Sequence, residues 1–166
     1  MGYDVKIERN LLHALFDLKG SFKDLNSYMK EHIASLPEEP NSYVAHGTWK
    51  ILYLGINHWI LLAPIEEERD LLELLKPENC PDSISIVLIS DTLKFFRING
   101  VNANDIMSIA SPLNLNTDAF TDNNATFSEV FGLKALIMRD GDGYQFGIDQ
   151  SFGDMISDYL DLTIAT

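Results

Sequence analysis

The fold is decided by the stretch Lys50-Ile51-Leu52-Tyr53-Leu54-Gly55-Ile56-Asn57-His58-Trp59-Ile60-Leu61-Leu62. Two apolar runs rich in β-favouring residues flank a polar turn that contains glycine, and this pattern predicts a β-hairpin. The acidic residues Glu66, Glu67 and Glu68 follow, and carboxylates are favourable at the positive end of a helix. The stretch therefore predicts two strands, Tyr43–Tyr53 and Trp59–Ala63, and then a helix that ends near Leu75.

The same order of features recurs in the second half of the chain. Strands are predicted at Ala125–Arg139 and Tyr144–Ile148, joined by the turn Asp140-Gly141-Asp142-Gly143 and followed by a helix at Met155–Leu162. In front of each pair of strands lie one more predicted strand and one more helix. The chain thus contains an internal repeat of the form β-α-β-β-α.

These upstream segments also correspond between the halves. The extended run Lys6–Leu18 precedes a helix that opens at Ser21, and Leu93–Ile98 precedes a helix over Asn102–Ala110. Ser21 is followed three residues later by Asp24, as Ser151 is by Asp154. A serine at this spacing from an acid predicts a capped helix start.

The fold class that follows is α+β, with two ferredoxin-like βαββα halves that form one domain. We expect this domain to cover residues 1–166, with repeats at about 6–80 and 83–166. Apolar residues make up 46% of the chain, enough for a substantial core.

Charge and cysteine content restrict the partners and the compartment. Asp and Glu number 25 against 12 Lys and Arg, which gives a net charge of −13. A chain of this charge repels phosphate backbones and anionic lipid, so we expect neither nucleic acid nor membrane as a partner. The single cysteine, Cys80, excludes an intrachain disulfide, and the sequence contains no signal peptide or membrane-spanning run. We therefore expect a soluble, cytoplasmic protein.

No pattern for nucleophilic or metal chemistry is present. The sequence lacks a Gly-x-Ser-x-Gly elbow, and Cys80 lies in a proline-flanked loop with no evident histidine partner. The four histidines show no ligand spacing and are interpreted as packed or surface residues: His13, His32, His46 and His58. Catalytic and metal residues are therefore predicted to be none, and cofactor-binding residues stay unknown.

Two loops only partly match known binding motifs. Gly141–Gly147 has the wrong glycine spacing for a dinucleotide loop and joins two strands, so a hairpin turn explains it better. Asp140 and Asp142 also match the first two ligand positions of a calcium loop. Tyr144 stands where the third oxygen ligand is required, so the pattern fails. Three further acids have partial calcium-loop spacing but are interpreted as loop residues: Asp118, Asp122 and Glu129.

Three segments together resemble a known family. They are Leu54–Leu62; Asn99–Ala103 with Ile106, followed by Ser111–Leu115 and Phe120; and Gln150–Met155 with Tyr159 and Leu160. In this order and spacing they resemble the gamma subunit of heterotetrameric sarcosine oxidase. The sequence departs from that family where Ile56 replaces proline, Asn57 and Asn114 replace acids, and Gln150 replaces arginine.

The resemblance implies a truncated form of the folate-binding fold of T-protein-type aminomethyltransferases. It also implies a non-catalytic gamma subunit in a complex that oxidises sarcosine to glycine and feeds folate-linked one-carbon metabolism. Alpha, beta and delta subunits are the implied partners. They would carry FAD, FMN, NAD, tetrahydrofolate and zinc, and this chain would carry no cofactor and have no activity alone.

Other functions stay open. The chain could instead be a stand-alone folate-binding or one-carbon-transfer protein on the same fold. It could also be the small subunit of a related N-methyl amino acid dehydrogenase, or an α+β protein without such partners. Adjacent genes for the other subunits, or folate binding by the isolated chain, would separate these functions.

Overall fold

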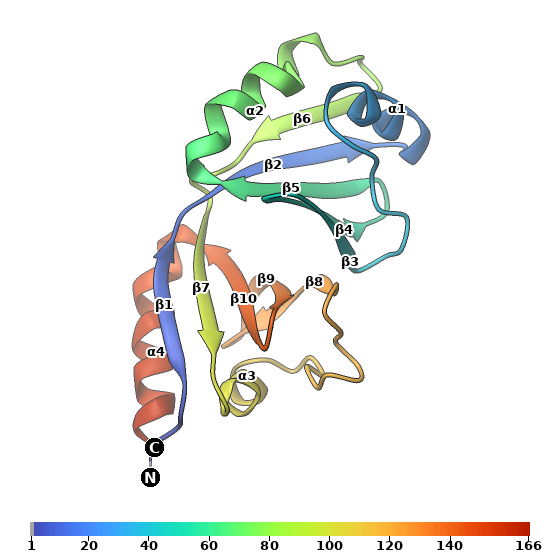
Figure 1. The fold of residues 1–166 in the computed structure, drawn as a ribbon. Helices are drawn as coiled ribbons and strands as arrows, with labels where there is room; N and C mark the ends of the chain where they lie inside the picture. Colours follow the sequence, from blue (N-terminus) through green and yellow to red (C-terminus); the bar gives the residue numbers. More distant parts are fainter. Residues whose placement is uncertain (1) are drawn as a thin grey trace. The chain divides into compact units, whose positions relative to one another are not determined.

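The computed structural model describes residues 2–166 and divides them into two units. One unit, which we call the continuous unit, is Leu12–Ser90. The other, which we call the split unit, consists of residues 2–11 and Asp91–Thr166. Each unit contains one five-stranded antiparallel sheet and two α-helices (Figure 1). The α+β class expected from the sequence is confirmed.

The continuous unit has the sheet order β3-β4-β5-β2-β6. Its elements are β2 (His13–Gly20), α1 (Phe22–His32), β3 (Ser42–His46), β4 (Trp49–Gly55), β5 (His58–Pro64), η1 (Ile65–Glu67), α2 (Glu68–Leu75), η2 (Pro77–Asn79) and β6 (Ile84–Leu88).

The split unit has the sheet order β1-β7-β10-β9-β8. Its elements are β1 (Lys6–Leu11), β7 (Leu93–Asn99), α3 (Ala103–Ala110), β8 (Ala125–Val130), β9 (Leu133–Asp140), β10 (Gly143–Asp149), η3 (Gln150–Phe152) and α4 (Gly153–Ala165).

The two sheets have the same topology. Reading β3-β4-β5-β2-β6 against β8-β9-β10-β7-β1 matches every strand by its neighbours. The four inner matches also agree in their place relative to the helices, whereas the edge strands differ, because β6 follows both helices of its unit and β1 precedes both helices of its own. Trp59 pairs with Leu18 on the adjacent strand, and Tyr144 pairs with Ile98 in the same manner. The predicted equivalence of the Trp59 and Tyr144 strands is therefore confirmed.

The strand count between the helices differs from the sequence-based expectation. Tyr43–Tyr53 is split into β3 and β4 by a tight turn at Gly47, where φ is +62°. Ala125–Arg139 is likewise split into β8 and β9 by Phe131 and Gly132, both with positive φ. Each helix pair thus encloses three strands rather than two, because a two-residue turn interrupts a run that is β-favouring on both sides.

The predicted extended run Lys6–Leu18 also divides into two strands. β1 pairs with β7 of the split unit, whereas β2 pairs with β5 and β6 of the continuous unit. The pairing register of β1 shifts between Glu8 and Leu11, and Asn10 adopts a left-handed φ of +60°. In each sheet one edge strand is separated in sequence from the other four. In the split unit β1 precedes them, and in the continuous unit β6 follows them.

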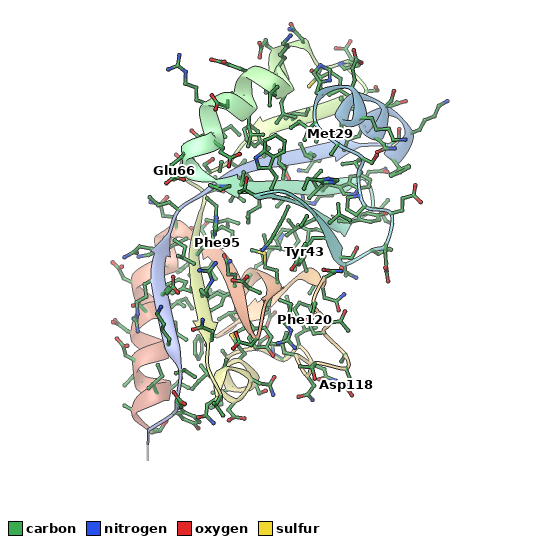
Figure 2. The ribbon with its side chains drawn as sticks, viewed as in Figure 1. Met29, Tyr43, Glu66, Phe95, Asp118 and Phe120 are labelled. Carbon is green, nitrogen blue, oxygen red and sulfur yellow. The ribbon has the colours of Figure 1, made fainter. Side chains whose placement is uncertain are left out.

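In each unit the two helices pack on one face of the sheet. In the continuous unit Met29 of α1 and Leu71 of α2 join Phe16 and Trp59 in one core, and Figure 2 labels Met29 on its helix. In the split unit a second core is formed by Ile106 of α3, Ile156 of α4 and strand residues such as Phe96, Ile98, Tyr144 and Phe146. All of these side chains are almost fully buried.

The two serine caps have different outcomes. Ser21 caps α1 as expected, since its hydroxyl accepts from the backbone N–H of Asp24 at 3.2 Å. Ser151 does not cap α4, and that prediction is wrong. It lies within η3, where the carboxylate of Asp149 accepts from the Ser151 N–H at 2.9 Å, and α4 begins two residues later at Gly153.

Candidate functional site

The four histidines and the single cysteine all belong to the continuous unit, and the Tyr28 side chain contacts both His32 and Cys80. His58 contacts the carboxylate of Asp17 across β5 and β2, and the ring of His32 stacks on Tyr28 with centroids 4.0 Å apart. Cys80 ends η2, where burial is the main factor that raises the pKa of its thiol. A thiol with a raised pKa is a weak nucleophile at neutral pH. Among residues 2–166, no three His, Cys, Asp or Glu side chains are grouped as metal ligands.

The two loops with partial binding motifs are placed as follows. Gly141 and Asp142 form the turn between β9 and β10, so the predicted hairpin is confirmed. Asp118 and Asp122 lie in the turn-rich segment before β8, whereas Glu129 is on β8 itself and not in the loop where it was predicted. The strand position of Glu129 follows from the β-favouring run that contains it.

A polar row crosses the sheet of the split unit on the face opposite its helices. Arg97 donates through Nε to Asp140 at 2.5 Å, and its Nη1 lies 3.4 Å from Glu8. Gln145 donates to the same Asp140 oxygen at 2.8 Å. Arg97 on β7 is thereby held between Glu8 on the adjacent strand β1 and Asp140 on β9, which lies beyond β10 in the sheet. These contacts cross-link β1, β7 and β9.

A buried arginine fixes the segment that precedes β8. Arg139 is 3% exposed, and its guanidinium lies over the Tyr144 ring, 4.5 Å from the centroid. Its Nε donates to the carbonyl of Phe120 at 3.2 Å, and its Nη2 lies 3.4 Å from the carbonyl of Leu115. The Tyr144 hydroxyl lies 2.6 Å from the same Leu115 carbonyl. Sequence inspection did not single out Arg139, and its position in an apolar strand was the available signal.

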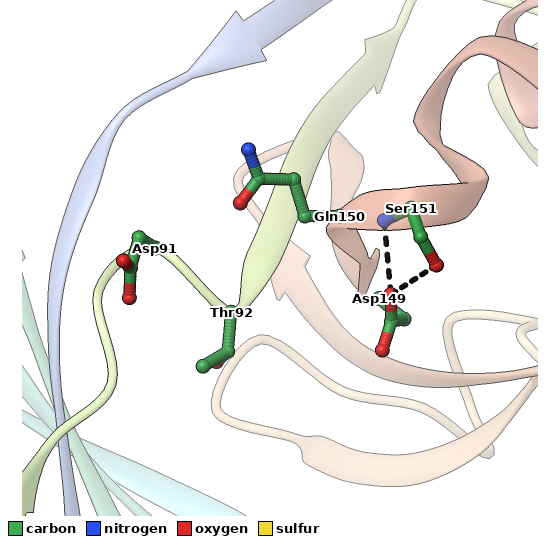
Figure 3. A pocket seen from close by; sticks show the side chains of 5 residues that line it. All are labelled: Asp91, Thr92, Asp149, Gln150 and Ser151. Atoms are coloured by element: carbon green, nitrogen blue, oxygen red, sulfur yellow. Dashed lines mark hydrogen bonds between the residues drawn. The ribbon is translucent and has the colours of Figure 1, made fainter.

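The start of α4 borders a shallow depression of about 520 Å³ (Figure 3). It is lined by Asp91, Thr92, Asp149, Gln150 and Ser151. One Asp149 oxygen is already occupied, because it accepts from both the N–H and the hydroxyl of Ser151. These bonds lower the pKa of the Asp149 carboxyl, which caps the N-terminus of η3. A carboxylate with a lowered pKa stays ionised and is a poor general base.

Another shallow depression, of about 330 Å³, lies on the continuous unit. It is lined by Asp24, Ser27, Tyr28, Glu31, Pro81 and Ser83. The Tyr28 hydroxyl donates to the Leu75 carbonyl at 2.6 Å, and burial is the main cause of its raised pKa. Neither depression brings together a nucleophile, a base and an oxyanion donor.

Large apolar side chains are exposed on both units. Those at least a third exposed are Leu12, Ile56, Leu74, Val87 and Leu88 on the continuous unit, and Val101, Ile109, Phe152, Tyr159 and Leu162 on the split unit. Val87 and Leu88 are consecutive on the edge strand β6, while Tyr159 and Leu162 are three residues apart on α4. Among residues 2–166, no helix is long and apolar enough to span a membrane.

Comparison with solved structures defines the class of fold. The chain superimposes with a TM-score of 0.68 on glycine cleavage system aminomethyltransferase T from Bartonella henselae, with 10% identity over 96% of this chain and 46% of that chain. The chain therefore spans about half the length of that aminomethyltransferase. This likeness shows that the chain has the same type of α+β fold as that part of the aminomethyltransferase.

A structure of heterotetrameric sarcosine oxidase from Corynebacterium sp. U-96 is more similar. It superimposes with a TM-score of 0.85 and 17% identity, covering 97% of this chain and 84% of that chain. The resemblance predicted from the sequence is thus confirmed at the level of fold. No protein-family model matches the chain, and no curated protein sequence matches it significantly.

Proposed function

We propose that this chain is a non-catalytic, gamma-type subunit of a sarcosine-oxidase-like flavoenzyme complex, with a structural role in assembly. The observation that carries the proposal is the extent of the fold match. It covers 97% of this chain and 84% of a chain from a heterotetrameric sarcosine oxidase, so the two have similar lengths as well as similar topology. A subunit of this kind would hold the other subunits of the complex in position but would supply no reacting groups.

The side chains of both units support a structural role. The polar groups of Arg139, Arg97 and Asp149 all contact groups of the chain itself. The exposed apolar residues, by contrast, are available for contacts with other subunits, because burying them would remove apolar surface from water. The proposed partners are alpha, beta and delta subunits in the cytoplasm, which would hold FAD, FMN, NAD, tetrahydrofolate and zinc.

Co-expression tests this proposal. In this experiment an affinity tag is added to the chain, and the oxidase subunits encoded by neighbouring genes are co-expressed without a tag as candidate partners. The expected result is co-purification of a yellow partner in a fixed ratio, with no flavin on the chain when it is purified alone. Failure of every flavin-bearing candidate to co-purify would contradict the proposal.

A second function is favoured by the aminomethyltransferase likeness. A stand-alone folate-binding or one-carbon-transfer protein could use the same fold, because 96% of this chain superimposes on aminomethyltransferase T. Titration of the isolated chain with tetrahydrofolate by calorimetry separates the two functions. Stoichiometric binding by the isolated chain would favour the folate protein, and the absence of heat would favour the structural subunit.

A further inference from the structure

The strand β6 forms one edge of the sheet in the continuous unit, where it pairs only with β2. The run that contains it, Ser83-Ile84-Ser85-Ile86-Val87-Leu88-Ile89-Ser90, has no charged residue and no proline. An edge strand of this composition can pair with another extended chain, and proteins usually block such edges. Whether such pairing is possible depends on which backbone groups of β6 are not already bonded.

The pairing register identifies the groups that face away from β2. Val87 pairs with Asp17, and the N–H of Ile89 donates to the carbonyl of Leu15 at 2.8 Å. In an antiparallel ladder alternate residues bond to the neighbour, so Ile86 and Leu88 direct their N–H and carbonyl groups outward.

Only part of this outer edge is covered by the loop before β6. The N–H of Ile84 donates to the carbonyl of Pro81 at 3.1 Å, and the backbone of Ile86 hydrogen-bonds to Cys80. Within residues 2–166, the outward N–H and carbonyl of Leu88 have no hydrogen-bond partner. The side chains of Val87 and Leu88 are 49% and 37% exposed. An open, apolar edge thus remains at the C-terminal end of β6.

The counterpart edge in the split unit is protected. β1 carries Lys6, Glu8 and Arg9, and its register shifts beside Asn10, which has a positive φ. Charges and irregularities of this kind prevent another strand from pairing. The two edges occupy the same place in two sheets of the same topology, so the fold itself does not explain why β6 lacks this protection.

We propose that β6 accepts an extended segment of a partner subunit, which adds a sixth strand to this sheet. The proposal deepens the assembly role and rests on it. Because the chain carries a net charge of −13, with Glu78 and Asp82 exposed just before β6, a second copy would be repelled. The complementary segment has β-branched apolar residues in its middle and basic residues at its ends.

The test uses the full chain and a defined probe. The probe is the acetylated and amidated peptide Lys-Thr-Val-Thr-Val-Thr-Lys, and its control has glutamate at both ends. Amide NMR spectra of the isotope-labelled chain are recorded during titration with each peptide. We expect the lysine peptide to shift the amides of residues 84–89 first, and the glutamate peptide to bind at least tenfold more weakly.

Two variants and a matched control locate the site. Leu88→Pro removes an N–H that does not bond to β2, and Val87→Lys places a charge on the edge. Either change should weaken binding at least tenfold, whereas Val101→Lys, the same substitution at an 83% exposed valine of the split unit, should not change it. Circular dichroism and urea unfolding check that each variant is folded.

Each other outcome overturns the inference. Equal affinity in all variants, or amide shifts confined to other strands, would show that the edge is not the site. A dimer of the free chain that Leu88→Pro abolishes would mean that a second copy occupies it. If Val87→Lys co-purifies with the flavin subunit as well as the wild type does, the edge inference fails while the proposed function stands. Peptide binding at this edge with no co-purifying oxidase subunit would overturn the proposed function, and with it the assignment of the added strand to a partner subunit.

Discussion

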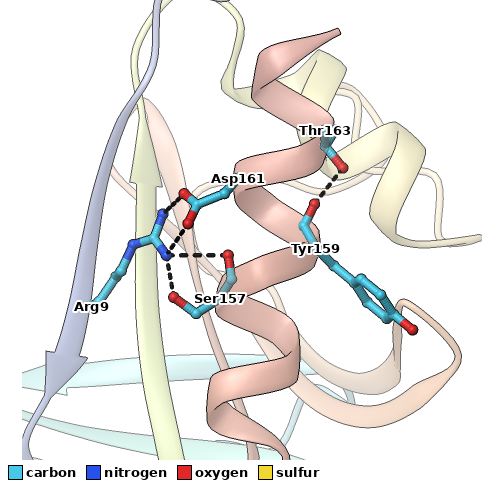
Figure 4. A network of polar contacts seen from close by, with 5 residues as sticks. All are labelled: Arg9, Ser157, Tyr159, Asp161 and Thr163. Atoms are coloured by element: carbon cyan, nitrogen blue, oxygen red, sulfur yellow. Dashed lines mark hydrogen bonds and ion pairs between the residues drawn. The ribbon is translucent and has the colours of Figure 1, made fainter.

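The guanidinium of Arg9 on β1 lies 2.5 Å from the carboxylate of Asp161 on α4 (Figure 4). The same guanidinium contacts the hydroxyl of Ser157 and donates to its backbone carbonyl at 3.2 Å. The N-terminal strand and the C-terminal helix of the split unit are therefore joined by one side chain. Since β1 is separated in sequence from the rest of its sheet, this contact helps to hold an edge strand in place.

Replacement of Arg9 by Met should lower the free energy of unfolding by about 1 kcal/mol, because a partly exposed ion pair with additional hydrogen bonds is lost. Lys6→Met is the matched control, since Lys6 is on the same strand and its side chain is 73% exposed. Urea unfolding measures both. Equal stability of the two variants would show that the Arg9 contact contributes nothing.

The helix starts predict different responses to the same substitution. Ser21→Ala should lower the free energy of unfolding by about 0.5–2 kcal/mol, because the cap to the Asp24 N–H is lost. Ser151→Ala should change it by less than about 0.5 kcal/mol, because Ser151 caps no helix. Thermal and urea unfolding of the two variants check this order. A larger loss for Ser151→Ala would contradict the assignment of the caps.

Substitution of Gly143, which lies against Ile98, and of Gly153, which lies against Lys94, should have different effects on stability. A Cβ at Gly143 would lie 2.1 Å from the Ile98 carbonyl oxygen, which is fixed in the sheet. The three atoms nearest to a Cβ at Gly153 would all belong to the flexible side chain of Lys94. Gly143→Ala should therefore cost about 2 kcal/mol or more, whereas Gly153→Ala should be nearly neutral. Similar unfolding midpoints for both would refute this account of Gly143.

Tyr144 makes the stability depend on alkaline pH. Burial raises the pKa of its hydroxyl, although the nearby Arg139 opposes the effect. Tyr144 therefore loses its hydroxyl proton at a lower pH in the unfolded chain, where tyrosines ionise near pH 10, than in the folded chain. The free energy of unfolding is unaffected below about pH 10 and falls as the pH rises above it. Tyr144→Phe should reduce the fall between pH 8 and pH 11 in urea unfolding. Tyr159→Phe, at a 40% exposed ring, is the control, and an equal effect of both would contradict the prediction.

The sequence predicted those parts of the fold that depend on local patterns. The hairpin around Ile56 and Asn57, the acidic starts of α2 and the Ser21 cap follow from turn residues and helix-end charges next to each element. The internal repeat was visible for the same reason, since Trp59 and Tyr144 follow similar turns in both halves.

Features that depend on contacts distant in sequence were not predictable. Nothing in Lys6–Leu18 indicates that its first part pairs with β7 and its second with β5, because strand partners are chosen by tertiary packing. The open edge of β6 is visible only once β2 is known to cover one side alone. Arg139 acquires its meaning only when the carbonyls of Leu115 and Phe120 come within reach.

We propose that this chain is a structural subunit of a flavoenzyme complex. The most direct measurement compares size-exclusion chromatography and sarcosine oxidation for the co-expressed oxidase subunits with and without this chain. We predict a single flavin-containing peak that includes this chain in a fixed ratio, and a loss of assembled, active oxidase when the chain is omitted. Elution of this chain as a separate monomer, together with a fully active oxidase formed without it, would contradict the account.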